Sequence, residues 1–173
     1  SGVGRKRIYT SFGYELLVAF LGGVENVVGR AKNELGLTSV VSDGSLAGGL
    51  MGTLEDVEEV ARRWLGGDPV LSGYLPTMTA PFLPELDGVV PGFGRSDPCP
   101  WGLGPQIRGT GGHWMGANWP ATSFGHFGQS GSMVLADPEH HCALVAVSDR
   151  GFGSWAVATW PTWTSACHKE FIA

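Results

Sequence analysis

One segment of the sequence combines a histidine, a glutamine and two serines with closely spaced glycines. It runs Gly125-His126-Phe127-Gly128-Gln129-Ser130-Gly131-Ser132 and leads directly into a predicted hairpin. Glycines let a substrate approach the backbone, and free N–H groups there can stabilise an oxyanion, so carbonyl chemistry is one interpretation. The other is a tight turn before a strand, with His126 hydrogen-bonded in the core. The segment is not a Gly-x-Ser-x-Gly nucleophile elbow, because Ser132 stands where the last glycine is needed.

A second segment places a tyrosine just before the expected start of a helix. The residues Arg7-Ile8-Tyr9-Thr10-Ser11-Phe12-Gly13 lead into an apolar periodic stretch. Taken alone, Ser11 is equally well explained as a helix N-cap and Tyr9 as a packed aromatic residue.

Together the two segments resemble motifs of the serine β-lactamase-like superfamily, in particular its class C-related esterases and D-Ala-D-Ala peptidases. Residues 9–17 resemble the motif Tyr-Ser-Asn-x-Gly-Tyr-x-Leu-Leu, with Ser11 at the asparagine position, and residues 125–128 resemble Gly-His-x-Gly, followed by the expected Asp137-Pro138. Three further segments resemble Pro-Leu-Gly-Met, Ala-Gly-Gly-Leu…Thr-x-x-Asp and Tyr-Gly-Leu-Gly: residues 34–40, 47–56 and 101–104. The five segments follow the family's order and cover nearly the whole chain.

The resemblance implies a serine acyl hydrolase that forms an acyl-enzyme, which water then cleaves. Tyr9 would be its general base, or a proton relay together with a lysine. His126 stands where many β-lactamases carry the lysine of Lys-Thr-Gly, within the signature that ends at Gly128. The backbone N–H of Gln129 would be one oxyanion donor. The implied partner is a small-molecule ester, amide or β-lactam substrate, and no cofactor is implied.

The sequence departs from the family's pattern at the nucleophile. The family's reactive serine belongs to a Ser-x-x-Lys motif upstream of the tyrosine, but the residues three positions before the lysines here are Val3, Gly29 and Ala166. Two N-terminal strands of the family's sheet have no visible counterpart either. We therefore expect residues 1–173 to be the C-terminal portion of one catalytic domain, inactive alone, whose N-terminal part can be a separate fragment. A non-catalytic binding module on the same fold is the alternative.

Two substitutions favour an esterase over a β-lactamase. His126 is mostly neutral at pH 7 and would hold a substrate carboxylate less strongly than a lysine. Ser11 in place of asparagine removes an amide that could donate to a substrate carbonyl. Trp101, Phe124 and Phe127 lie near the histidine in sequence and would line an apolar substrate pocket, with packing in the core as the alternative.

The remaining histidines and the cysteines do not form a recognisable metal motif. The spacing of His140, His141 and Cys142 against Cys167 and His168 fits no structural zinc pattern, so no metal is expected. Three cysteines are an odd number, which argues against a disulfide framework and favours a reducing, cytoplasmic location.

Helices are predicted on both sides of the glycine-rich middle of the chain. Apolar residues recur at helical spacing from Gly13 to Val28, and Gly22-Gly23 should divide them into two helices. Thr53 is a predicted N-cap for a helix with one apolar face that ends at Gly66-Gly67. A closing helix is predicted over residues 154–171, interrupted at Pro161.

Strands are predicted at residues 101–108, 132–136 and 142–147, the last two joined by the turn Asp137-Pro138-Glu139-His140. Residues 66–100 contain seven prolines and are expected to form loops. The fold class is therefore α/β (α+β): an antiparallel sheet flanked by helices, incomplete at the N-terminus.

Composition excludes several classes of protein. Hydrophobic residues are 43% and charged residues 16% of the chain, which is incompatible with intrinsic disorder. A net charge of −5 without a basic stripe offers no surface for nucleic acid. The longest apolar run is far shorter than a bilayer span, so no membrane partner is expected.

Overall fold

A four-stranded antiparallel sheet lies at the centre of the computed structural model, which describes residues 4–66, 68–111 and 113–172. Its strands lie in the order β5 (Gln106–Ile107), β6 (Phe124–Phe127), β7 (Met133–Asp137) and β8 (Cys142–Ala146). The β7–β8 hairpin turns at residues 138–141, as the Asp-Pro sequence predicts. The predicted fold class is confirmed.

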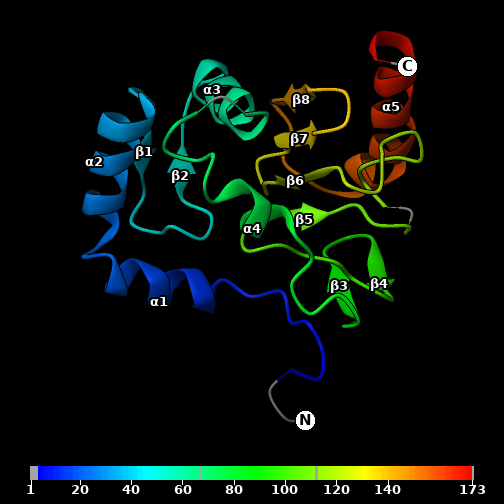
Figure 1. Ribbon diagram of the computed structural model, residues 1–173, viewed down its shortest axis with the longest axis horizontal. Coiled ribbons are helices and arrows are strands. Elements are labelled where there is room, and N and C mark those ends of the chain that lie inside the picture. The colour runs from blue at the N-terminus through cyan, green and yellow to red at the C-terminus, as the bar shows by residue number, and fades with distance from the viewer. Residues whose placement is uncertain (1–3, 67, 112, 173) are drawn as a thin grey trace.

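Each face of the sheet packs against one helix, α3 (Leu54–Trp64) or α5 (Ser154–Phe171), as Figure 1 shows. Side chains alternate along β6, so Phe124 packs beside Trp64 of α3, whereas Phe127 packs against Trp160 of α5. His126 shares its face of the strand with Phe124. The alternation therefore decides which side of the sheet carries the candidate histidine.

The predicted N-terminal helices form as two elements, α1 (Phe12–Phe20) and α2 (Val24–Leu35). Gly22 and Gly23 have φ angles of 83° and 97°, a region that favours glycine, and they end α1 as expected. α1 leaves much of its apolar surface in solvent, with Phe20 88% exposed. Among the described residues no single helix is long and apolar enough to cross a membrane; α1 and α2 together meet the length and composition criteria, but they are bent by 77°.

Helix α3 begins as its sequence predicts. The Thr53 hydroxyl accepts a hydrogen bond from the Asp56 N–H, and the Asp56 carboxylate accepts one from the Thr53 N–H, which forms a capping box. The helix is followed by a turn at Leu65-Gly66, and Gly67, the other half of the predicted stop, lies outside the described residues.

The middle of the chain is more ordered than its prolines suggest. A short helix, α4 (Leu75–Thr79), and a hairpin of β3 (Gly88–Val90) with β4 (Gly94–Ser96) form within the predicted loop. Another small ladder pairs β1 (Val41–Ser42) with β2 (Leu50–Met51). The prolines lie between or at the starts of these elements, where a missing N–H breaks no ladder bond.

The predicted interruption of the closing helix at Pro161 is wrong, because α5 is continuous across this residue. Trp160 and Thr164 on either side are almost completely buried and fix the helix to the core. The Thr164 hydroxyl donates to the carbonyls of Trp160 and Trp114, which joins the helix to the preceding loop. Tertiary contacts thus outweigh the helix-breaking tendency of the proline.

Candidate functional site

An open cleft of about 400 Å³ brings together the two segments with predicted chemistry. Tyr9, Ser11, Trp101 and His126 all line it, although 117 residues separate the first from the last. The other lining residues come from the same N-terminal segment, the β1–β2 loop, β3 and the turn after Trp101: Arg7, Ile8, Thr10, Tyr14, Leu46, Ala47, Val89, Gly102 and Gly104. The structure therefore gathers four of the predicted site residues in one place.

Tyr9 and His126 face each other across the cleft. The Tyr9 hydroxyl lies 3.5 Å from His126 Nε2, and the two rings stack with centroids 6.1 Å apart. Trp101 contacts both rings, at centroid distances of 5.9 Å from Tyr9 and 5.6 Å from His126. A phenol, an imidazole and an indole thus contact one another in the cleft, with the Tyr9 hydroxyl at the limit of hydrogen-bond distance from His126.

Arg7 holds the N-terminal segment in place although no regular element contains it. Its Nε donates to the Cys99 carbonyl at 2.8 Å and its Nη2 to the Phe82 carbonyl at 2.6 Å. The Arg7 backbone N–H donates to the Asp87 carbonyl at 2.8 Å. These contacts position Tyr9 two residues later, and they occupy the guanidinium with protein acceptors.

Two glycines allow the parts of the cleft next to His126 and Trp101 to form. A Cβ on Gly125 would overlap the Val134 carbonyl of β7, so only glycine permits this strand pairing beside His126. A Cβ on Gly102 would overlap the Met78 carbonyl, which lies against the turn after Trp101. Both glycines belong to the motifs that the sequence analysis singled out, and both are explained by close backbone approach.

The electrostatic setting keeps both facing groups neutral at pH 7. Burial raises the pKa of Tyr9 above 10.0, and the neighbouring Tyr14 raises it further. Burial lowers the pKa of His126 below 6.5, with a hydrogen bond to the Phe127 backbone acting in the opposite direction. Within the described residues the phenol therefore needs an added positive charge before it can act as a base near neutral pH.

Ser11 occupies the N-cap position of α1, yet its side chain makes no capping bond. Its carbonyl accepts the first helical hydrogen bonds from the N–H groups of Tyr14 and Glu15. Thr10 caps the turn instead, through its Oγ1, which accepts from the Phe12 N–H at 3.2 Å. The Ser11 side chain thus lines the cleft without a capping role.

The two backbone candidates, Gly128 and Gln129, follow directly after β6 but do not line the cleft. The Gly128 N–H donates to the Ser132 carbonyl at 2.9 Å, so it is occupied. Gln129 is exposed, and its carbonyl accepts from the Phe152 N–H. Its own N–H has no backbone acceptor within the described part of the chain.

The structure separates the predicted pocket aromatics. Trp101 lines the cleft, but Phe124 and Phe127 are only 2% and 8% exposed and belong to the hydrophobic core. Phe124 packs with Ile107 and Ala136 on the α3 side, whereas Phe127 packs on the α5 side. The alternative of core packing therefore holds for both phenylalanines, because the pleat turns each toward a helix.

The sequence did not predict three other residues that line the cleft: Tyr14 and the aliphatic residues Leu46 and Val89. Tyr14 lies five residues after Tyr9, one turn into α1, and its presence in the same motif was the available signal. Leu46 and Val89 come from loops and short ladders that carry no chemical signature, so nothing in the sequence pointed to them.

Comparison with solved structures shows the family of this chain. No family model matches the chain, and no curated protein does. The crystal structure of a β-lactamase from Mycobacterium bovis superposes with a TM-score of 0.89 at 31% sequence identity, over 100% of this chain and 67% of that one. The chain belongs to the β-lactamase-like family. Its helices and antiparallel sheet are those of this β-lactamase-like fold, and one third of the Mycobacterium chain has no counterpart in the present sequence.

Proposed function

We propose that this β-lactamase-like chain carries part of the active site of a serine acyl hydrolase that works through an acyl-enzyme. The observation that supports it most directly is the Tyr9 hydroxyl 3.5 Å from His126 Nε2, inside a cleft large enough for a small ester. The printed sequence contains no Ser-x-x-Lys. The proposal therefore places the nucleophilic serine and its lysine in a segment corresponding to the unmatched third of the Mycobacterium protein.

In the proposed mechanism Tyr9 takes the proton of the attacking serine. Its raised pKa makes this unfavourable in the chain alone, and a lysine ammonium next to the phenol would reverse the effect by favouring the phenolate. His126 would then accept or return the proton through Nε2, since a neutral imidazole has one free acceptor nitrogen. The serine oxygen bonds to the substrate carbonyl carbon, and the alcohol leaves with the proton that Tyr9 or His126 returns. Water then attacks the acyl carbon and breaks its bond to the serine, which releases the carboxylic acid.

Charge in the cleft favours an uncharged ester over a carboxylate-bearing β-lactam or peptide. His126 is neutral at pH 7, and the Arg7 guanidinium already donates to the backbone carbonyls of Cys99 and Phe82. The one cation among the described lining residues is Arg7, and its Nε and Nη2 are directed at backbone carbonyls rather than at a substrate. The exposed Gln129 N–H would serve as an oxyanion donor only after the serine segment closes the site beside it.

The test is fluorophosphonate labelling of the protein made from the full reading frame that encodes this chain. The expected result is one labelled serine outside residues 1–173, together with hydrolysis of p-nitrophenyl esters. Residues 1–173 alone should neither become labelled nor turn over esters or nitrocefin. A labelled serine within residues 1–173 would overturn the placement of the nucleophile.

The alternative is a binding module without catalysis, favoured by the raised pKa of Tyr9 and by Ser11 in place of the family's asparagine. It predicts that the full reading frame has no Ser-x-x-Lys and that its product resists acylation. Absence of labelling and of ester hydrolysis in the longer protein would reject the hydrolase and leave this alternative.

A further inference from the structure

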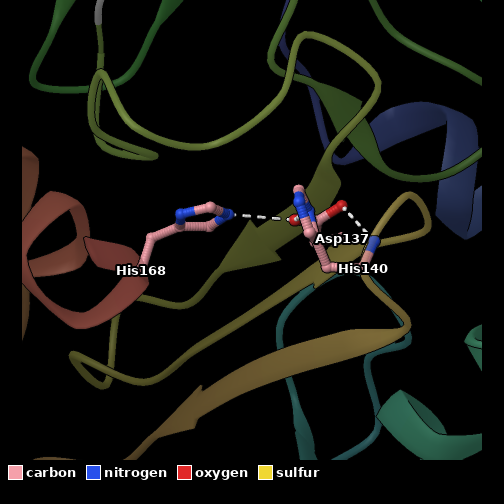
Figure 2. A group of neighbouring side chains, drawn as sticks. All are labelled: Asp137, His140 and His168. Carbon is pink, nitrogen blue, oxygen red and sulfur yellow. Dashed lines mark hydrogen bonds and ion pairs between the residues drawn. The ribbon is translucent and has the colours of Figure 1, made fainter. Parts of the chain in front are cut away.

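Three residues far from the cleft converge at one end of the β7–β8 hairpin, as Figure 2 shows. Asp137 is the last residue of β7, His140 lies in the turn that follows, and His168 belongs to the last turn of α5. Asp137 Oδ2 lies 2.7 Å from His140 Nδ1 and 3.0 Å from His168 Nε2. None of these residues lines the Tyr9–His126 cleft.

The two imidazoles converge on the same carboxylate oxygen for a structural reason. The other oxygen, Asp137 Oδ1, already accepts the backbone N–H groups of Glu139 and His140, which fixes the carboxylate plane. One oxygen and two ring nitrogens therefore face one another, all within 4.8 Å. This set has the composition and the spacing from which a metal ion can be bound with little movement.

Burial makes the group unlike an ordinary surface cluster. Asp137 is 0% exposed and His168 4%, whereas the His140 side chain is 44% exposed. Hydrogen bonds from His168, His140 and two backbone N–H groups hold the carboxylate in place. The exposed His140 leaves an entry path for a solvated ion.

The ring of His168 is free to change its tautomer. Its Nδ1 is buried, and no hydrogen-bond partner for it exists among the described residues. Nothing outside the cluster therefore fixes the proton on one ring nitrogen, and Nε2 can present either an N–H to Asp137 or a lone pair to a cation.

We propose that Asp137, His140 and His168 form a binding site for a divalent transition-metal ion, with zinc as the best match. Two imidazole nitrogens and one carboxylate oxygen are a ligand set that zinc accepts, with a fourth position left to water on the exposed side. Calcium and magnesium prefer all-oxygen sites, so the two nitrogens disfavour them. The bound ion would join the β7–β8 turn to the C-terminal helix.

Cys142 is not counted as a ligand although it pairs with Asp137 across the hairpin. Its sulfur is not among the ligand atoms that lie within 4.8 Å of one another, so the site consists of one carboxylate and two imidazoles. No metal was expected because the spacing of His140 and His168 was compared only with that of the cysteines. Asp137, which brings the two histidines together, was not included.

The experiment measures cobalt and zinc binding to metal-free protein that carries no polyhistidine tag. Cobalt should bind at one ion per chain with a visible d–d spectrum, zinc should displace it, and zinc should raise the melting temperature. His140→Ala should weaken zinc binding by about 100-fold or more, since it removes a direct ligand. His140 is exposed, so this variant keeps the fold.

His141→Ala is the matched control, because His141 is the next residue of the same turn and is outside the cluster. It should bind zinc like the unchanged protein. Two results would overturn the proposal: no stoichiometric binding of either metal at micromolar concentration, or equal zinc affinity in His140→Ala and the unchanged protein. In either case the three residues form only a hydrogen-bonded contact between the β7–β8 turn and α5. Neither result depends on hydrolase activity, so the outcome is separate from the proposed function.

Discussion

The two regions built around histidine differ in how completely their polar groups are paired. In the cleft, Tyr9 and His126 meet at 3.5 Å, and both remain open to solvent on one side. In the cluster at the end of the hairpin, Asp137 accepts four hydrogen bonds and is completely buried. The cleft groups are open to a substrate, whereas the buried network around Asp137 also contributes to the stability of the fold, whether or not the proposed ion is bound.

This difference predicts that substitutions in the two regions affect different measurements. A change in the cleft should alter catalysis and leave unfolding almost unchanged. A change at Asp137 should alter unfolding first. The following predictions test this separation, from the largest expected effect to the smallest.

Tyr9→Phe should lower kcat for a p-nitrophenyl ester by about 10³-fold in the protein made from the full reading frame, because it removes the proposed proton acceptor. The free energy of unfolding should change by less than about 0.5 kcal/mol, since the hydroxyl has only one long contact. Steady-state kinetics and urea unfolding measure the two effects. Tyr14→Phe, in the same cleft, is the control and should retain most activity; equal losses in both variants would contradict the role of Tyr9.

Asp137→Ala should lower the free energy of unfolding by about 4 kcal/mol, because it leaves the buried His168 ring and two backbone N–H groups of the turn without their acceptor. Urea unfolding at pH 7 measures this loss. Asp149→Ala, in the exposed turn after β8, should change it by less than about 0.5 kcal/mol. A loss below about 1 kcal/mol at Asp137 would show that the cluster contributes little to stability.

His113 shows the effect of burying a histidine without a carboxylate. Burial lowers its pKa from 6.5 to about 4, so between these values the unfolded chain binds a proton that the folded protein does not. Stability contributed by the neutral ring is therefore present above pH 6.5 and is lost as the pH falls toward 4, by about 3 kcal/mol in all. Urea unfolding across this range should show a weaker pH dependence in His113→Asn than in the unchanged protein; parallel curves would contradict the prediction.

The smallest effect concerns His126 itself. Burial lowers its pKa, so its ring proton resonances should titrate with a midpoint below 6.5 in an NMR pH series. A midpoint for His126 above 6.5 would indicate an anionic neighbour and contradict the neutral cleft.

Much of the fold could be predicted because local sequence signals coincide with the tertiary structure. Thr53 and Asp56 form the predicted capping box, Gly22-Gly23 separates the first two helices, and the Asp137-Pro138 turn joins the predicted strands. The β3–β4 hairpin was missed because Val89 and Val90 form a run too short to show a period. The interruption predicted at Pro161 was wrong because helix propensity does not account for the burial of the residues around it.

The cleft could be predicted only in part. The order of the family's motifs predicted Tyr9, Ser11, Trp101 and His126, and the structure places all four in the cleft. Side-chain direction on β6 was not considered, and this placed Phe124 and Phe127 in the pocket rather than in the core. The Asp137–His168 contact joins a strand end to a helix end 31 positions later, and no spacing rule covers such a pair.

The contact between Trp119 and His168 gives the cluster an optical reporter. The two rings meet edge to face with centroids 5.0 Å apart, and Trp119 is only 1% exposed. An event that moves or ligates the His168 ring, such as binding of the proposed ion, should alter the contribution of Trp119 to the fluorescence of the seven tryptophans. The protein thus contains its own probe for events at Asp137, and no label has to be attached to observe them.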